Sequence, residues 1–169
     1  MLIDCSYFTV GPRHIQNCTL GKVPNPNAEE VTATIKAYIA KYQQPFLTRA
    51  VGAPVAGAII SYLKLIEIEP DTEPQADLDM VIEQLREPFA EYVFFHILRD
   101  SNTQATMTGL VRLKCDNDYV APIRRQVNTW NDMVDMIAGF AEWCKSSNCT
   151  MPGISTDPHL LTKINVLNL

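Results

Sequence analysis

Apolar side chains recur every three or four residues from position 123 to position 144, and this spacing constrains the fold more than any other feature of the chain. An α-helix completes a turn every 3.6 residues, so such a series forms one continuous stripe along a helix. The stripe consists of Ile123, Val127, Trp130, Val134, Ile137, Ala141 and Cys144. The sequence therefore predicts a long helix here, with the core built around it and with Trp130 inside.

Two helices are predicted near the start of the chain. Asn27 and Glu30 resemble a capping box, and a helical stripe follows at Val31, Ile35, Ile39, Tyr42 and Phe46. This helix is expected to run from about Ala28 to the residues near Pro45. Gly52 offers a left-handed stop, and Pro54 suits the first turn of a second helix that extends to about Ile68.

A third helix is predicted from an almost wholly apolar segment. Its stripe is formed by Leu78, Ile82, Leu85, Phe89, Val93 and Ile97, and Phe94 and Phe95 widen it. A helix that is apolar nearly all round lies inside the core. Pro88 is expected to kink it, because a proline removes one backbone hydrogen bond.

The remaining segments lack helical periodicity. Residues 1–26 predict an irregular lead-in with a possible strand around Tyr7–Val10, and residues 100–121 predict a loop or β-hairpin arm. Residues 148–169 predict an extended C-terminal tail. The expected fold is mostly α, a small helical bundle of about four helices with a β-hairpin or extended arm. It forms one domain over residues 1–169, with the helical core in residues 27–147.

Composition and charge exclude several classes of protein. Hydrophobic residues make up 47% of the chain and charged residues 20%, which is typical of a globular domain. Lys and Arg total 14 against 19 Asp and Glu, a net charge of -5. The chain therefore lacks the basic surface that grips a phosphate backbone, although an acidic surface leaves DNA free to slide past it.

The termini and the cysteines indicate an intracellular protein. The first residues lack a basic segment followed by an apolar one, and no stretch reaches the roughly 18 apolar residues of a membrane span. Five scattered cysteines favour free thiols over a disulfide framework. We expect no secretion, no membrane insertion and a reducing, cytosolic origin.

Motifs for catalysis or metal binding are missing from the sequence. A zinc site of Cys115, Cys144, Cys149 and His159 is conceivable, but the spacing fits no standard pattern, and inert buried thiols are the better interpretation. His96 lies among aromatic and aliphatic residues, as a satisfied core histidine does. We expect no catalytic residue, no metal and no cofactor. Asn131, next to Trp130, is expected to tether the arm through its backbone.

Several of these elements together resemble a known family. The elements are Phe46-Leu47 and Gly52 after the first helix, an aromatic third helix that ends at Asp100, Thr103, Thr108-Gly109-Leu110-Val111, and Trp130-Asn131. In this order they resemble the small head-tail connector proteins of tailed bacteriophages and prophages, the adaptor or head-completion class. The resemblance covers residues 27–145.

The resemblance implies a structural virion protein without catalytic activity. Such adaptors form a homo-oligomeric ring, commonly a dodecamer, below the portal protein. The ring extends the DNA channel, through which DNA passes without sequence-specific binding, and offers a docking platform to the tail or stopper protein. It would lie in the neck of the virion after synthesis in the cytoplasm of the host bacterium.

The arm and the tail are the expected interaction segments. Each is polar and broken, yet each carries a short β-favouring run that can add to the sheet edge of a partner. The candidate interaction residues are Thr106, Thr108, Leu110, Val111, Leu113, Ile164, Val166 and Leu167. Two alternatives remain: another phage assembly subunit, in tail completion or associated with the capsid, and a helical small-molecule-binding or enzymatic domain.

Overall fold

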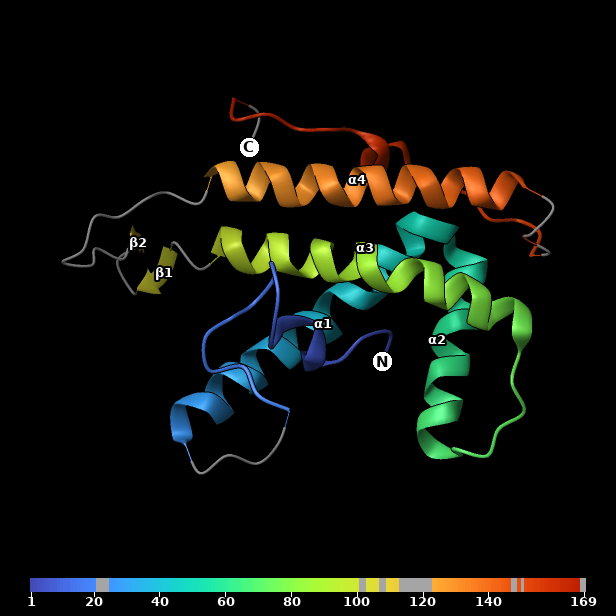
Figure 1. Ribbon diagram of the computed structural model, residues 1–169, viewed down its shortest axis with the longest axis horizontal. Coiled ribbons are helices and arrows are strands. Elements are labelled where there is room, and N and C mark those ends of the chain that lie inside the picture. The colour runs from blue at the N-terminus through green and yellow to red at the C-terminus, as the bar shows by residue number, and fades with distance from the viewer. Residues whose placement is uncertain are drawn as a thin grey trace.

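Helices α3 (Ala76–Asp100) and α4 (Ile123–Lys145) lie side by side and antiparallel in the computed structural model (Figure 1). The structure describes residues 1–20, 25–100, 103–106, 109–112, 123–146, 149 and 151–167. Within these residues it has four α-helices, two short 3₁₀ helices and one pair of strands. The predicted mostly helical bundle is confirmed, and none of the described helices is long and apolar enough to span a bilayer.

The centre of the core lies between α3 and α4. Leu85, Phe89 and Val93 of α3 are fully buried, as are Met133 and Ile137 of α4. The helix α3 continues through Pro88, as predicted, and Figure 1 shows that its axis bends partway along its length. The buried face of α4 is formed by Gln126, Thr129, Trp130, Met133, Val134, Ile137 and Phe140.

Helix α1 (Pro26–Val51) differs from the prediction at both ends. Asn25, and not Asn27, is its N-cap: the Asn25 side chain accepts a hydrogen bond from the Asn27 N–H at 3.0 Å, and Pro26 occupies the first turn. The helix also runs on for six residues beyond Pro45. Phe46 and Leu47 are completely buried, so their packing offsets the backbone hydrogen bond that the proline removes.

Gly52 alone separates α1 from α2 (Ala53–Ile68). Its φ of 83° lies in the region that residues with a Cβ rarely adopt. The glycine therefore ends α1 and allows α2 to begin at the next residue, and the stop at Gly52 is the one that the sequence predicts.

The N-terminal lead-in packs on the bundle. The strand expected around Tyr7–Val10 is wrong: Cys5–Phe8 form the 3₁₀ helix η1, because the Asp4 side chain caps it by accepting from the Ser6 N–H at 2.8 Å. Leu2 and Phe8 are part of the hydrophobic core. The first residues are irregular, as predicted, but they complete the fold.

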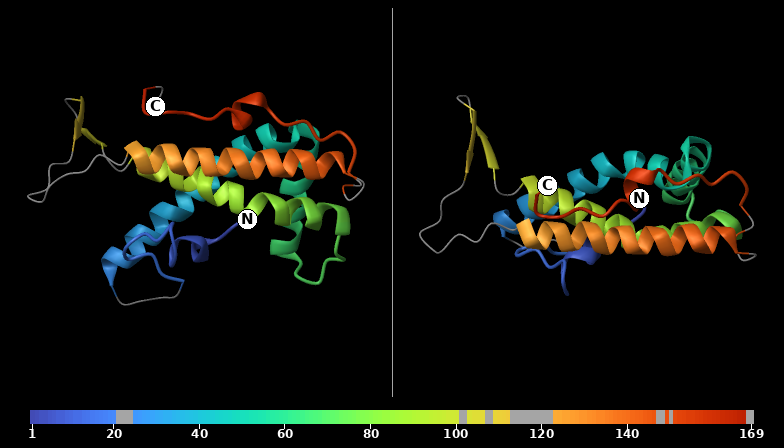
Figure 2. Two further views of the ribbon diagram at one scale, coloured as in Figure 1. Left: turned by 45° about the horizontal axis from the view of Figure 1, so that its top comes forward. Right: turned by 90° about the horizontal axis from the view of Figure 1, so that it is seen from above.

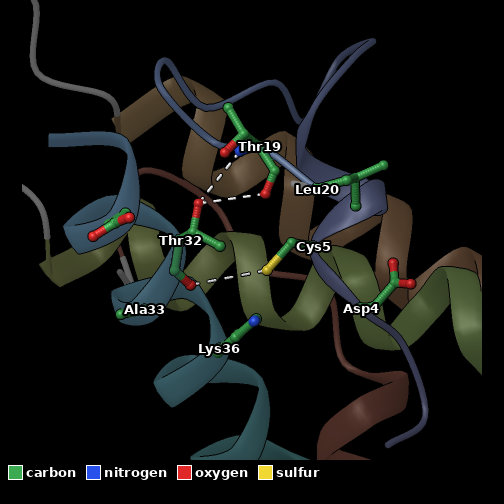
Figure 3. Close-up of a pocket in the computed structure, with 8 residues that line it drawn as sticks. Asp4, Cys5, Thr19, Leu20, Thr32, Ala33 and Lys36 are labelled. Carbon is green, nitrogen blue, oxygen red and sulfur yellow. Dashed lines mark hydrogen bonds between the residues drawn. The ribbon is translucent and has the colours of Figure 1, made fainter. Parts of the chain in front are cut away.

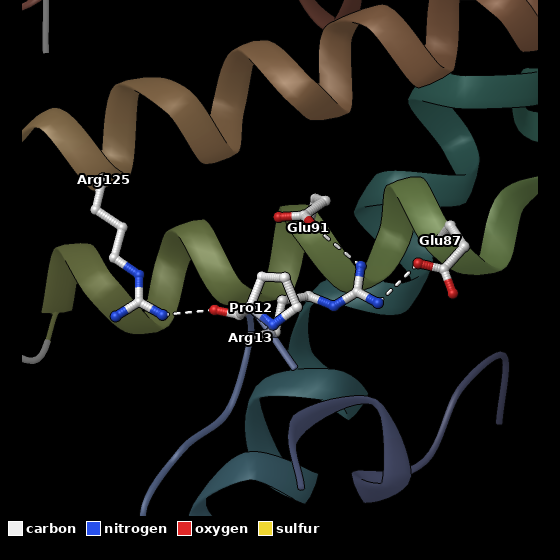
Figure 4. A network of polar contacts seen from close by, with 5 residues as sticks. All are labelled: Pro12, Arg13, Glu87, Glu91 and Arg125. Atoms are coloured by element: carbon white, nitrogen blue, oxygen red, sulfur yellow. Dashed lines mark hydrogen bonds and ion pairs between the residues drawn. The ribbon is translucent and has the colours of Figure 1, made fainter. Parts of the chain in front are cut away.

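An ionic network fixes this lead-in to the helices (Figure 4). The Arg13 guanidinium donates to Glu87 at 2.7 Å and to Glu91 at 3.0 Å, both on α3. Arg125 of α4 donates to the backbone carbonyl of Pro12 at 2.6 Å. Burial raises the pKa of Glu91, and Arg13 opposes that rise. The network thus neutralises a mostly buried carboxylate and ties three segments together.

The C-terminal tail, which the sequence predicts to be extended, packs on the bundle in residues 155–164, and Pro158–Leu161 within it form a 3₁₀ helix instead. Three tail residues donate hydrogen bonds to the last carbonyls of α1: Ser155 N to Val51 at 3.3 Å, Thr156 Oγ1 to Ala50 at 2.9 Å and Asp157 N to Arg49 at 2.7 Å. These carbonyls have no partner within their own helix. Leu160, in the 3₁₀ helix η2 (Pro158–Leu161), is completely buried.

Two strands form between α3 and α4 in the sequence. Strand β1 (Thr103–Thr106) pairs antiparallel with β2 (Gly109–Arg112), with Thr103 opposite Arg112 and Thr106 opposite Gly109. All views place this pair beyond the ends of α3 and α4, apart from the helices (Figures 1 and 2). Its position leaves it outside the core.

Candidate functional site

The strand pair carries three of the predicted interaction residues. Thr106 ends β1, while Leu110 and Val111 lie in β2 opposite Ala105 and Gln104. Thr108 and Leu113 lie outside the described residues. Within the part of the chain that the structure describes, the sheet has only these two strands, so each strand pairs along one edge. The backbone groups along the other edge have no strand to bond in the described chain.

The tail divides the other predicted residues into two groups. Ile164 is half-buried, and both its backbone groups bond Asn131: the Asn131 Nδ2 donates to its carbonyl at 3.1 Å, and its N–H donates to the Asn131 Oδ1 at 2.9 Å. Val166 is 55% exposed and Leu167 is 95% exposed. Of these three predicted tail residues, Val166 and Leu167 present exposed apolar surface to a partner.

Among the described residues Asn131 therefore tethers the tail, whereas the sequence predicts that it tethers the arm. An asparagine side chain carries both an acceptor and donors, so it can match the N–H and the carbonyl of one residue. Trp130 assists, because its Nε1–H donates to the Thr162 carbonyl at 2.9 Å while its ring is 5% exposed. Adjacent residues of α4 thus hold the tail at two points.

A pocket of about 450 Å³ opens where α1, α3, α4 and the tail meet. Arg49 and Arg99 supply cationic groups to its lining, and the rings of Tyr92, Phe95 and Trp130 supply an aromatic wall. Arg99 bonds Asp100 at 2.9 Å and the Tyr42 hydroxyl at 3.4 Å. Arg49 lies 3.9 Å from Asp157. Guanidinium groups beside aromatic rings are suited to bind carboxylates or other anions.

His96 also lines this pocket, but it is not the satisfied core histidine that the sequence predicts. Its ring stacks on Tyr42 at a centroid distance of 3.9 Å and meets Tyr92 edge-on at 4.6 Å. Both ring nitrogens are buried without a hydrogen-bond partner in the described structure. Burial, with the charge of Arg99, lowers the pKa of His96 to about 4. The imidazole is neutral at physiological pH.

This histidine predicts an acid-sensitive fold. The unfolded chain protonates His96 near pH 6.5, whereas the folded chain does so only near pH 4. The stabilisation is complete above pH 6.5 and is lost as the pH falls through 4, a change of about 3 kcal/mol. His96→Phe keeps a flat ring without a proton site. Between pH 7 and pH 4, denaturant unfolding should show a loss about 3 kcal/mol larger for the parent than for the variant. Equal losses would contradict the assignment.

A second pocket, of about 520 Å³, lies between the lead-in and α1 (Figure 3). Cys5 and Lys36 line it, and Thr32 Oγ1 accepts from the Thr19 N–H at 3.3 Å. Burial raises the pKa of the Cys5 thiol, although Lys36 opposes the rise. A protonated thiol is a poor nucleophile. The polar contacts of Cys5 and Thr19 with Thr32 in this pocket join the lead-in to α1.

The thiols near the end of α4 are the remaining candidates for chemistry. Cys144 and Cys149 are half-buried and free, and burial raises the pKa of Cys144 to about 12, with Cys149 adding to the rise. The described residues contain no group of three His, Cys, Asp or Glu side chains placed to hold a metal ion. Cys115, the fourth member of the conceivable zinc site, lies outside the described residues.

Sequence reasoning missed the pocket around Arg49 and Arg99. The two arginines are 50 positions apart, and no spacing rule connects them. The sequence does contain a histidine within a run of aromatic residues. This run indicates a densely packed region, but it does not indicate that a pocket opens there. Comparison of the chain with protein-family models, curated proteins and solved structures found no match.

Proposed function

We propose that this chain is a structural assembly subunit that forms a ring with copies of itself, and that it serves as a head-tail connector adaptor of a tailed bacteriophage. In this role it would lie in the neck of the virion between the portal protein and the tail or stopper protein. The ring would extend the DNA channel. The proposal rests on the sequence resemblance together with one structural observation, the isolated pair of strands.

The isolated strand pair supports the proposal on physical grounds. A two-stranded sheet without a helix or a third strand to cover it is marginally stable in water. The pair β1–β2 lies apart from the helices (Figure 2). It gains stability when a strand of another chain extends it, because backbone hydrogen bonds then satisfy the open edge. An assembly subunit makes use of such an arm, whereas a monomeric enzyme does not need one.

The charge of the chain agrees with a channel role. Lys and Arg total 14 and Asp and Glu total 19, a net charge of -5. A channel that carries DNA must not bind the phosphate backbone tightly, and an acidic wall repels it. This supports passage of DNA without sequence-specific contact.

Removal of the arm tests the proposal. We expect the full-length protein to form large homo-oligomers, and a variant with residues 103–112 replaced by a short Gly-Ser linker to remain monomeric. Light scattering after gel filtration measures the mass, and circular dichroism checks that the helices and the melting temperature are retained. A milder variant, Leu110→Pro, removes one backbone N–H from β2 and should weaken assembly. If both variants assemble like the parent, the arm is not the interface.

A further inference from the structure

The arginines that line the pocket, Arg49 and Arg99, carry more N–H donors than their hydrogen bonds use. A guanidinium carries five N–H donors, and the hydrogen bonds of Arg99 to Asp100 and Tyr42 use two of them. Arg49 and Arg99 are 44% and 48% exposed at their side chains, so both can reach a group that enters from outside. Tyr92 and Trp130 are buried behind them. The pocket therefore offers an aromatic floor with a rim of two arginines, each of which also contacts one aspartate of the same chain.

The loop between α2 and α3 has the opposite character. Glu69, Asp71 and Glu73 are exposed, and none of these three carboxylates forms an ion pair with another described residue. Ile68, just before the loop, is 76% exposed. The loop thus presents three carboxylates beside an uncovered aliphatic side chain.

The loop has a fixed shape. Thr72 closes a turn by donating its N–H to the Glu69 carbonyl at 3.1 Å. At its far end the Tyr62 hydroxyl accepts from the Gln75 N–H and donates to Asp79, both at 3.1 Å. A preformed loop loses little conformational entropy when it binds.

Loop and pocket cannot meet within one chain. The loop precedes the first residue of α3, and Arg99 is near its last. A helix of 25 residues is about 37 Å long, so the loop and Arg99 lie at opposite ends of α3. Figure 1 shows the loop at the end of α3 that is remote from the strands. Complementary surfaces at opposite ends pair head to tail between copies, and such contacts generate rings when the rotation closes.

We propose that the acidic loop of one copy docks in the arginine pocket of the next copy around the ring. The carboxylates of Glu69 and Glu73 meet the guanidinium groups of Arg49 and Arg99, and Ile68 packs against the aromatic wall. This inference rests on the proposed ring and names the second contact that closes it. The arm joins neighbours through backbone bonds, while the loop and pocket set the direction of assembly through charge.

Charge exchange between the two surfaces tests the inference. Arg49→Glu with Arg99→Glu reverses the pocket, and Glu69→Lys with Glu73→Lys reverses the loop. Each pair of changes should raise the concentration needed for half-assembly by about tenfold or more, since like charges then face each other. A chain with all four changes restores opposite charges at each docking contact between copies, so its assembly should recover. Mass photometry over a dilution series gives the oligomer fraction.

Two controls separate the possible failures. Glu30→Lys with Glu142→Lys changes the net charge as the loop variant does, on exposed positions outside both surfaces, and should leave assembly unchanged. Thermal melting verifies that each variant folds, because Arg49 and Arg99 also contact Asp157 and Asp100. If the parent forms rings and the fourfold variant does not recover, the docking inference fails and the ring stands. If the parent stays monomeric, both proposals fail.

Discussion

Truncation after Ser147 is expected to abolish cooperative unfolding of the protein. The deletion removes the fully buried Leu160, the partners of Trp130 and Asn131, and the three donors that cap α1. A buried leucine alone contributes about 2 to 5 kcal/mol. With the lost hydrogen bonds the cost reaches at least about 5 kcal/mol, comparable to the whole stability of a small domain. Calorimetry and circular dichroism should show no sharp transition.

A shorter truncation provides the matched control. Ending the chain after Asn165 removes the exposed Val166 and Leu167 but keeps both hydrogen bonds between Asn131 and Ile164. Its melting temperature should stay within a few degrees of the parent, since exposed residues contribute little to stability. A long truncation that melts like the parent would show that the tail does not belong to the core.

Trp130→Ala is expected to cost about 3 to 5 kcal/mol of unfolding free energy, because it leaves a cavity and frees the tail. The Trp130 ring contacts Phe95 at a centroid distance of 5.0 Å and His159 at 5.4 Å, so it joins α3, α4 and the tail. Trp130→Phe keeps most of the ring but loses the donor to the Thr162 carbonyl, and should cost about 1 to 2 kcal/mol. Urea unfolding of the three proteins measures the order.

Equal stability of Trp130→Ala and the parent would contradict the burial of this side chain. Equal losses for the alanine and phenylalanine variants would show that the hydrogen bond, and not the ring, carries the effect. Either result would require the contact between α4 and the tail to be revised.

All four helices could be predicted from helical periodicity, because the buried residues of each helix lie three or four positions apart in the sequence. The predicted end of α3 at Asp100 and the predicted extent of α4, residues 123–144, agree with the structure within two residues. The buried face of α4 is rotated from the predicted stripe, however. Met133 and Phe140 are buried although the stripe omits them, and Val127 and Ala141 are only half-buried. Thr129 is buried although it is polar, so a pattern of hydrophobic residues alone does not identify it as part of the buried face.

The roles of the two ends of the chain could not be predicted from local pattern. Leu160 enters the core because of its contact with distant helices, and Thr156 caps a carbonyl 106 residues earlier. Short segments rich in Gly, Pro and Asn show no period, so burial of their few apolar residues depends on contacts that only the folded chain reveals. The same holds for the pocket between Arg49 and Arg99.

The mass and shape of the purified protein, alone and mixed with a bacteriophage portal protein, test the proposed ring assembly most directly. We expect negative-stain images of closed rings with a central channel, and a mass that is a whole multiple of 19.0 kDa, commonly twelvefold if the resemblance to connector adaptors holds. The arm-replaced variant should show single subunits on the same grids. Monomers or dimers of the parent at every concentration, both with and without the portal protein, would contradict the proposed function.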